Sequence, residues 1–336
     1  MKGLPSCITM ESLFNAGAYM LRNLLAILAD GDFHSGEELG TQLGVTRAAV
    51  WKQLKKLEAL NIPLSSVKGK GYRLSDAIEL LDQPAILNKI EGRLDCLEVL
   101  LNTESTNSYL LEKASDQMGK RYAVLAEKQE SGRGRRGRTW VSPFGKNIYL
   151  SMLWSFNGGI GSLEGLSLVI AIAVERALAE LGMEDARLKW PNDVLLNGGK
   201  VAGILLESIG EGGGVSHLAI GIGVNLADAP TPTQVEPQAM RPVSLLSETG
   251  VPIAPEEFLD LLASAYARLE HQFTTLGFAP IREAWLARAA KLGEVITART
   301  MTSETIGTFE TIDAQGNLVL KTSQGRVAIA AADVFF

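Results

Sequence analysis

The 336-residue sequence predicts a multidomain α+β protein with a small helical N-terminal module, a central α/β domain and a small C-terminal β-barrel. Short helical patterns joined around a glycine occupy the first part of the chain. Strand-like and helix-like patterns alternate through the middle, and only short runs rich in β-branched residues follow Gly293. These patterns place the domains at 20–80, 81–290 and 291–336.

Residues 1–19 precede the first expected helix. We interpret them as an N-terminal extension, which is either a disordered tail or the result of a start site assigned upstream of Met20. They contain no apolar core of the length that a signal peptide needs.

The first domain is expected to contain three short helices. Ser35 and Glu38 have the spacing of a capping box, which would open the second helix. Thr46 is a suitable N-cap for the third, whose residues Val50 and Leu54 share one apolar face. The expected spans are 21–30, 36–42 and 47–60.

Residues 62–73 follow these helices and predict a β-hairpin with a Gly/Lys tip, so the whole module is typical of a winged helix-turn-helix. Between residues 45 and 75, Glu58 is the only acid, which favours DNA as the partner. The alternative is a module that binds protein or only positions its neighbour. The candidate DNA-binding residues are Thr46, Arg47, Trp51, Lys52, Lys55, Lys68, Lys70 and Arg73.

The central domain shows five strand-like segments and three helical ones, separated by Gly-rich turns at 198–199 and 210–214. A segment rich in Pro, Thr and Gln, 227–242, is expected to be a mobile loop. The expected strands are 122–127, 147–154, 186–190, 201–208 and 215–224, and the expected helices are 164–181, 255–275 and 280–290.

Composition excludes several classes of protein. Two cysteines are too few for a disulfide framework, and the three scattered histidines form no metal-ligand pattern, so no metal site made of protein ligands alone is expected. The longest apolar run is too short to span a bilayer, so we expect no membrane partner and a cytoplasmic protein. The net charge of −6 argues against a protein that coats nucleic acid over its whole surface.

Residues 132–138, GRGRRGR, combine three glycines with four arginines. Glycines allow a backbone to approach a ligand closely, and arginines bind carboxylates and phosphates, so the segment predicts an anion-clamping loop. A solvated basic loop and a nucleic-acid contact are the alternatives. The glycine spacing also matches a dinucleotide-binding fingerprint, but Pro143 prevents a following helix and no acid occurs between Glu130 and Glu164.

Six segments around this loop together resemble the biotin protein ligases, and the N-terminal module makes the chain similar to the bifunctional ligase/repressor kind. The segments are Ser105-Thr106-Asn107, Glu127-Lys128-Gln129, GRGRRGR with Trp140, Lys189-Trp190-Pro191-Asn192-Asp193, Lys200-Val201-Ala202-Gly203-Ile204-Leu205 and Gly221-Ile222-Gly223-Val224-Asn225. The resemblance implies a class II synthetase-like (biotin/lipoate ligase) domain with a mixed sheet and an SH3-like C-terminal barrel.

The resemblance also implies the reaction and its participants. Biotin and ATP would form biotinyl-5′-AMP with Mg²⁺ as cofactor, and biotin would pass to a lysine of the biotin carboxyl carrier protein of acetyl-CoA carboxylase. The adenylate-bound homodimer would bind operator DNA of biotin synthesis genes as a repressor, with Arg136 as a candidate interface residue.

Site roles are carried over to the matching positions. The implied catalytic residues are Arg135, Lys200 and Asp193, where Asp193 would assist Mg²⁺ or orient the acceptor lysine. The implied biotin-binding residues are Ser105, Thr106, Asn107, Gln129, Gly132, Arg133, Arg135, Lys200 and Gly203. The implied ATP- and adenylate-binding residues are Arg133, Arg135, Trp140, Lys189, Asn192, Asp193 and Asn225.

Several of these residues have ordinary structural alternatives. Ser105 and Thr106 would also suit a helix N-cap, Trp140 would suit core packing, and Lys200 would suit a solvated hairpin end. Two other functions compete with the ligase: a biotin-sensing transcription factor without turnover, and a lipoate or octanoate ligase on the same fold. The sequence departs from the family at Phe336, where members often continue with a tail that carries an arginine.

Overall fold

The computed structural model describes residues 16–336 except 61, 76–77, 91, 118, 158–164 and 210–214. Most of the predicted 1–19 extension therefore lies outside the described residues, as does the predicted turn at 210–214. Residues 16–19 belong to the first helix, which begins five residues before the predicted start. Within the described ranges, no helix has the length and apolar character needed to cross a membrane.

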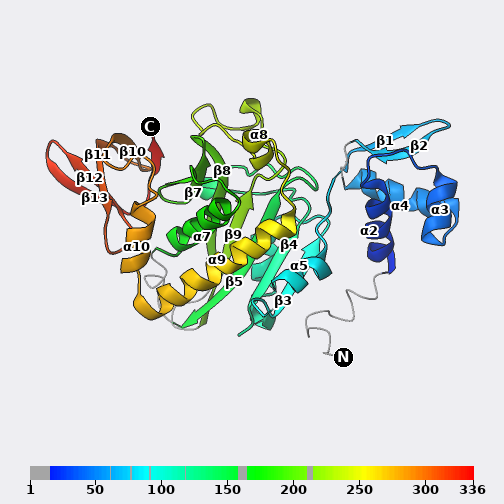
Figure 1. Cartoon of the computed structure of the whole chain (residues 1–336), viewed down its shortest axis with the longest axis horizontal. Helices are drawn as coiled ribbons and strands as arrows, with labels where there is room; N and C mark the ends of the chain where they lie inside the picture. The colour runs from blue at the N-terminus through cyan, green and yellow to red at the C-terminus, as the bar shows by residue number, and fades with distance from the viewer. Residues whose placement is uncertain are drawn as a thin grey trace.

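The N-terminal domain contains the three predicted helices and the predicted hairpin (Figure 1). The capping box is present, since the Glu38 amide donates to Ser35 Oγ and the Ser35 amide donates to the Glu38 carboxylate. Thr46 Oγ1 caps the third helix by accepting from the Ala49 amide. The elements are α2 (Ala16–Leu28), α3 (Gly36–Leu43), α4 (Arg47–Ala59), β1 (Leu64–Val67) and β2 (Gly71–Leu74).

The central domain is built on a seven-stranded mixed sheet with the order β3-β4-β5-β9-β8-β7-β6. The β3–β4 pair is parallel and the other pairs are antiparallel. The strands are β3 (Cys96–Leu100), β4 (Tyr122–Ala126), β5 (Ile148–Asn157), β6 (Arg187–Lys189), β7 (Asp193–Leu196), β8 (Gly199–Ile209) and β9 (Val215–Val224). The sequence patterns did not predict β3 and β7, which are short.

Helices cover both faces of this sheet. Helix α7 (Leu166–Glu180) packs on one face and is buried almost all round, because α9 (Pro255–Leu276) crosses its outer side. Helix α6 (Thr106–Glu112) packs on the opposite face. The remaining helical segments are α5 (Gln83–Lys89), η1 (Ala114–Gln117), η2 (Arg135–Gly137), η4 (Pro232–Gln234), α8 (Leu245–Thr249) and α10 (Ala279–Leu286).

Residues 291–336, all of which are described, form a five-stranded antiparallel sheet with the order β13-β12-β11-β10-β14. The two edge strands do not pair with each other, so the predicted SH3-like barrel is not closed. The C-terminal strand pairs back onto β10, which brings the chain end toward the central domain (Figure 1). The strands are β10 (Val295–Arg299), β11 (Glu304–Ile312), β12 (Leu318–Thr322), β13 (Gly325–Ile329) and β14 (Asp333–Phe335).

Candidate active site

A pocket of about 530 Å³ lies where α6, the GRGRRGR loop, the β6–β7 turn, the ends of β8 and β9 and strand β14 meet. All of the residues predicted to bind biotin or the nucleotide line it except Gly132. Those that line it are Ser105, Thr106, Asn107, Gln129, Arg133, Arg135, Trp140, Lys189, Asn192, Asp193, Lys200, Gly203 and Asn225.

Gly132 is buried beneath the loop instead. Its carbonyl accepts from the Trp140 amide at 2.8 Å, and a Cβ on Gly132 would meet the Trp140 carbonyl at 2.5 Å. The glycine therefore allows the two limbs of the loop to approach each other.

Trp140 lies over glycines of the sheet. A Cβ at Gly223 would meet the indole ring at 2.5 Å, and one at Gly203 would meet it at 3.0 Å. The ring is half-buried and forms a wall of the pocket rather than part of the core, with Lys200 Nζ 5.4 Å from its centroid. The sheet accommodates a tryptophan here because these positions carry no side chain.

One end of the pocket is a network of neutral hydrogen-bonding groups. Gln129 Oε1 accepts from the amide and hydroxyl of Thr106 at 2.9 and 3.0 Å. Ser151, buried on β5, donates from Oγ to Thr106 Oγ1 and Asn107 Oδ1. Ser105 occupies the N-cap position of α6, as its sequence position suggested, but its side chain makes no capping hydrogen bond within the described residues, and Ser105 lines the pocket.

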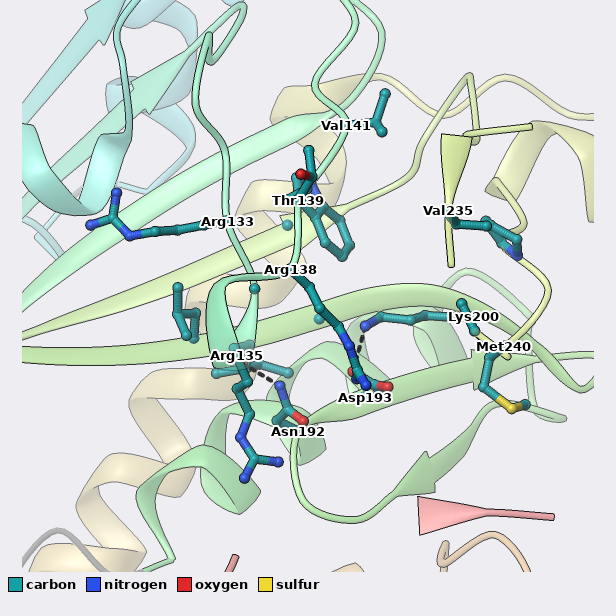
Figure 2. A pocket seen from close by; sticks show the side chains of 18 of the residues that line it. Arg133, Arg135, Arg138, Thr139, Val141, Asn192, Asp193, Lys200, Val235 and Met240 are labelled. Atoms are coloured by element: carbon teal, nitrogen blue, oxygen red, sulfur yellow. Dashed lines mark hydrogen bonds and ion pairs between the residues drawn. The ribbon is translucent and has the colours of Figure 1, made fainter. Parts of the chain in front are cut away.

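The other end is charged. Lys200 Nζ and Asp193 Oδ1 form an ion pair of 2.7 Å, which Figure 2 shows at the centre of the pocket. The pair is positioned by the β7–β8 ladder, whose register shifts between Val194 and Leu195. Asn192 is fixed beside it, because its amide donates to the Ile204 carbonyl at 2.7 Å.

The four arginines of the loop do not share one partner: Arg136 and Arg138 both bind Asp333, whereas Arg133 and Arg135 bind other groups. Arg133 Nε donates to Glu207 at 2.9 Å and points away from Lys200. Arg135 donates only to the Ala332 carbonyl, at 3.3 Å, among the hydrogen bonds of the described residues. Arg136 and Arg138 both bind carboxylates, since both donate to Asp333 and Arg138 also pairs with Glu236. Arg135 is thus the loop arginine whose guanidinium has no carboxylate partner in the part of the chain that is described.

Burial lowers the pKa of Arg135 and of Lys189 from their ordinary values. In Lys189, the attraction of Asp193 opposes this effect. Desolvated cations of this kind gain most from the arrival of an anion. Lys189 Nζ also lies 5.5 Å from the Phe336 ring centroid.

Asn225 is buried at the end of β9, and its amide donates to the Val243 carbonyl at 3.0 Å. Its buried Oδ1 has no hydrogen-bond donor among the described residues.

Sequence reasoning missed several residues of the pocket. The segment predicted only as a mobile loop supplies a wall that includes Val235 and Met240 (Figure 2). Asp333 comes from the C-terminal domain, in which the sequence predicted no site residue. The Pro-rich composition of 227–242 indicated a loop but gave no sign of its position, since only the fold brings the segment to the pocket.

The described residues hold no group of three or more His, Cys, Asp or Glu side chains arranged to bind a metal. The carboxylates that line the pocket are Asp193, Glu236 and Asp333, and each pairs with a cation.

The predicted DNA-contacting residues lie on α4 and the hairpin. All are exposed except Arg73, which is half-buried with its guanidinium 4.7 Å from the Phe33 ring centroid. Trp51 is 53% exposed on the surface of α4. The exposed residues are Thr46, Arg47, Trp51, Lys52, Lys55, Lys68 and Lys70.

Comparisons with known families divide the chain into the same three regions. The Biotin/lipoate A/B protein ligase family matches residues 100–225, an HTH domain matches residues 21–73, and the Biotin protein ligase C terminal domain matches residues 291–336.

Individual proteins resemble longer parts of the chain. A biotin--[acetyl-CoA-carboxylase] ligase of Paracoccus denitrificans is 55% identical over 71% of this chain and 99% of its own length. The bifunctional ligase/repressor BirA of Escherichia coli is 37% identical over 89% of this chain and 91% of its own. The structure of the Aquifex aeolicus biotin protein ligase in complex with biotin and ATP superposes with a TM-score of 0.60 at 26% identity, covering 71% of this chain and 97% of that one. The chain therefore belongs to the biotin protein ligase family and carries a helix-turn-helix domain at its N-terminus.

Proposed function

We propose that the pocket binds biotin and ATP, forms biotinyl-5′-AMP and delivers biotin to a lysine of the carrier protein of acetyl-CoA carboxylase. The observation that supports this most strongly is the polarity of the pocket. One end offers the neutral donors and acceptors of Thr106 and Gln129, and the other offers the cations Lys200 and Arg135. A ligand with a neutral urea ring at one end and a carboxylate at the other suits this arrangement.

In the first step, a carboxylate oxygen of biotin attacks the α-phosphorus of ATP, and the bond to the β-phosphate breaks to release pyrophosphate. Both reactants are anions, so charge repulsion and positioning dominate the barrier. Lys200 would reach both the carboxylate and the α-phosphate once Asp193 is displaced or shared. Arg135, without a carboxylate partner of its own among the described contacts, would neutralise the phosphate.

In the second step, the amine of the acceptor lysine attacks the acyl carbonyl and AMP leaves, while the amine gives up a proton. Asp193 is the carboxylate beside the reacting end, so it suits two roles: orienting the incoming amine, or contributing a ligand to Mg²⁺. Mg²⁺ usually keeps several waters and is held by substrate phosphates with one or two carboxylates. A pocket whose acids already pair with cations fits a Mg²⁺ carried mainly by ATP, which would supply further charge neutralisation.

Trp140 is the proposed adenine contact, and Val235 and Met240 line the same pocket. Adenine needs an apolar, planar surface, and an indole fixed over glycines provides one. Lys189, Asn192 and Asn225 would complete the nucleotide end of the pocket.

The test combines purified protein with biotin, Mg²⁺, radiolabelled ATP and a biotin carboxyl carrier domain, and follows AMP release and carrier labelling. We expect both. Adenylate formation with an unmodified carrier would favour the sensor function, in which binding occurs without transfer. Turnover of lipoate or octanoate in place of biotin would keep the fold and change the substrate.

The N-terminal domain supports a second activity, repression of biotin synthesis genes with biotinyl-5′-AMP as corepressor. Its exposed basic surface is made of α4 and the hairpin tip, which are the parts of a winged helix that approach DNA. A homodimer formed when the adenylate is bound would read a palindromic operator. Carrier protein and operator are both encountered in the cytoplasm, where we place the chain. In a gel-shift assay, we expect the fraction of operator DNA bound by the protein to rise when biotin and ATP are added.

A further inference from the structure

Asp333, the first residue of β14, connects the C-terminal domain to the GRGRRGR loop. Its Oδ2 accepts from Arg138 at 2.7 Å and from Arg136 at 3.0 Å. Its side chain is only 12% exposed and lines the pocket, so these are partly desolvated ion pairs. Partly desolvated ion pairs hold their two partners together more strongly than exposed pairs do, because solvent and salt screen them less.

The loop adopts a backbone conformation that needs support. Arg136 has a φ of 56° and Gly137 has a φ of 73°, so two consecutive residues are left-handed. This region is unfavourable for a residue with a side chain such as Arg136. The Arg136 guanidinium binds both Asp333 and the Arg299 carbonyl, which ties the strained residue to the C-terminal domain.

Ala332, the residue before Asp333, contacts a third arginine of the loop, Arg135. Arg135 donates to the carbonyl of Ala332, so residues 332–333 contact Arg135, Arg136 and Arg138 at one point. Asp333 is itself an anion beside a site for anions, and a direct contact with phosphate would be repulsive. Its useful contribution is therefore to the order of the loop.

We propose that Asp333 is a positioning residue that holds the GRGRRGR loop in place before the nucleotide arrives, so that Arg135 already lies at the wall of the pocket. An ordered loop has less conformational entropy to lose on binding, which favours the nucleotide complex. The inference rests on the proposed role of the loop in binding ATP. The C-terminal domain then contributes to the site by ordering the loop through Asp333.

The first measurement is the rate of trypsin cleavage within residues 132–138 of the full chain without ligands. Asp333→Asn should accelerate this cleavage by about tenfold, because two charge-assisted hydrogen bonds weaken. Glu310→Gln is the matched control, since Glu310 pairs with Arg326 in the same domain and does not line the pocket. The control should leave loop cleavage unchanged. Equal cleavage of Asp333→Asn and the parent protein overturns the proposal.

A second variant guards against misfolding of the C-terminal domain. Arg136→Gln removes one of the two contacts of Asp333 from the loop side without altering β14, so it should accelerate cleavage after the remaining loop arginines, by less than Asp333→Asn does. Faster cleavage inside 291–336 in Asp333→Asn, with no change in Arg136→Gln, would show damage to the domain and overturn the proposal. Partial recovery in Asp333→Glu supports it.

The kinetic readout separates this inference from the proposed function. Asp333→Asn should raise KM for ATP by about tenfold while changing the Kd for biotin by less than about twofold, because the neutral end of the pocket is untouched. Faster loop cleavage with an unchanged KM for ATP would confirm Asp333 as the anchor of the loop and contradict the role of the loop in nucleotide binding.

Discussion

The amide of Leu81 donates to the buried carboxylate of Glu127 at 2.8 Å, at the point where the N-terminal domain meets the central sheet. Arg22 of α2 donates to the carbonyl of the same Leu81. Two residues beyond Glu127, Gln129 binds Thr106 at the neutral end of the pocket. A single short segment therefore contacts both the inter-domain linker and the site.

Glu127 predicts a pH dependence of stability. Burial raises its pKa from 4.5 to about 7, against the opposing effects of the Leu81 amide and Arg22. The folded protein thus binds this proton more tightly than the unfolded chain does. The resulting stabilisation is complete below about pH 4.5 and is lost as the pH rises through about 7.

Glu127→Gln should remove this dependence while keeping an acceptor for Leu81. The free energy of unfolding of the variant relative to the parent should rise by roughly 3 kcal/mol between pH 4.5 and pH 8, measured by urea titration. Glu130→Gln is a control of opposite sign, because Lys128 lowers the pKa of Glu130 and that stabilisation is lost as the pH falls. A pH-independent difference for Glu127→Gln would contradict the prediction.

Lys200→Met should abolish most adenylation. The substitution removes the cation of the 2.7 Å pair with Asp193, and loss of one donor to a developing anion costs about 10²–10³ in kcat. Pyrophosphate release under saturating biotin and ATP measures it. Lys321→Met, at an exposed position in the C-terminal domain, should keep the parent rate. A raised KM with an unchanged kcat would contradict the prediction, because it would show that Lys200 binds the substrates and the transition state equally well.

Arg135→Gly should release biotinyl-5′-AMP before transfer. The variant loses the loop cation that has no carboxylate partner among the described contacts, so the adenylate is retained less well. Free adenylate would then label lysines on unrelated proteins, which a streptavidin blot of added bulk protein detects. The matched change Arg326→Gly, on an exposed strand of the C-terminal domain, should not do so. Labelling restricted to the carrier domain would count against this role.

Gly223→Ala should impair nucleotide binding selectively. The added methyl group would meet the Trp140 indole at 2.5 Å, so the ring must move. We expect KM for ATP to rise by about tenfold or more and the Kd for biotin to change little, measured by initial rates and calorimetry. An equal weakening of biotin binding would contradict the prediction, because it would show that Trp140 supports the biotin site as well as the nucleotide site.

Lys52→Gln should weaken operator binding without affecting ligation. Lys52 is exposed on α4, far from the pocket in sequence and absent from its lining. The slope of log K against log salt should fall by about 1, as expected for one lost phosphate contact. Lys120→Gln, on the central domain, provides the control. An unchanged salt slope would remove Lys52 from the DNA interface.

Local chemistry in the sequence determined the helices and strands that are long or clearly capped. The capping box of Ser35 and Glu38, the Thr46 cap and the strand-like pattern of 215–224 all correspond to observed elements, because these signals act between residues a few positions apart. The four-residue strand β7 was not predicted, whereas the shorter β6 lies within the expected strand 186–190, so length alone does not decide which short strands a sequence reveals.

The sequence also determined which residues gather at the pocket, because the resemblance is carried by residues with distinctive chemistry at fixed spacing. The tertiary structure decided how they are used. It directed Arg133 to Glu207, joined Arg136 and Arg138 to Asp333, and left Arg135 with only a carbonyl partner among the described residues. It also left the C-terminal sheet open where a barrel was expected. These pairings link positions up to 197 residues apart, and no local pattern encodes a contact that only the packing of two domains creates.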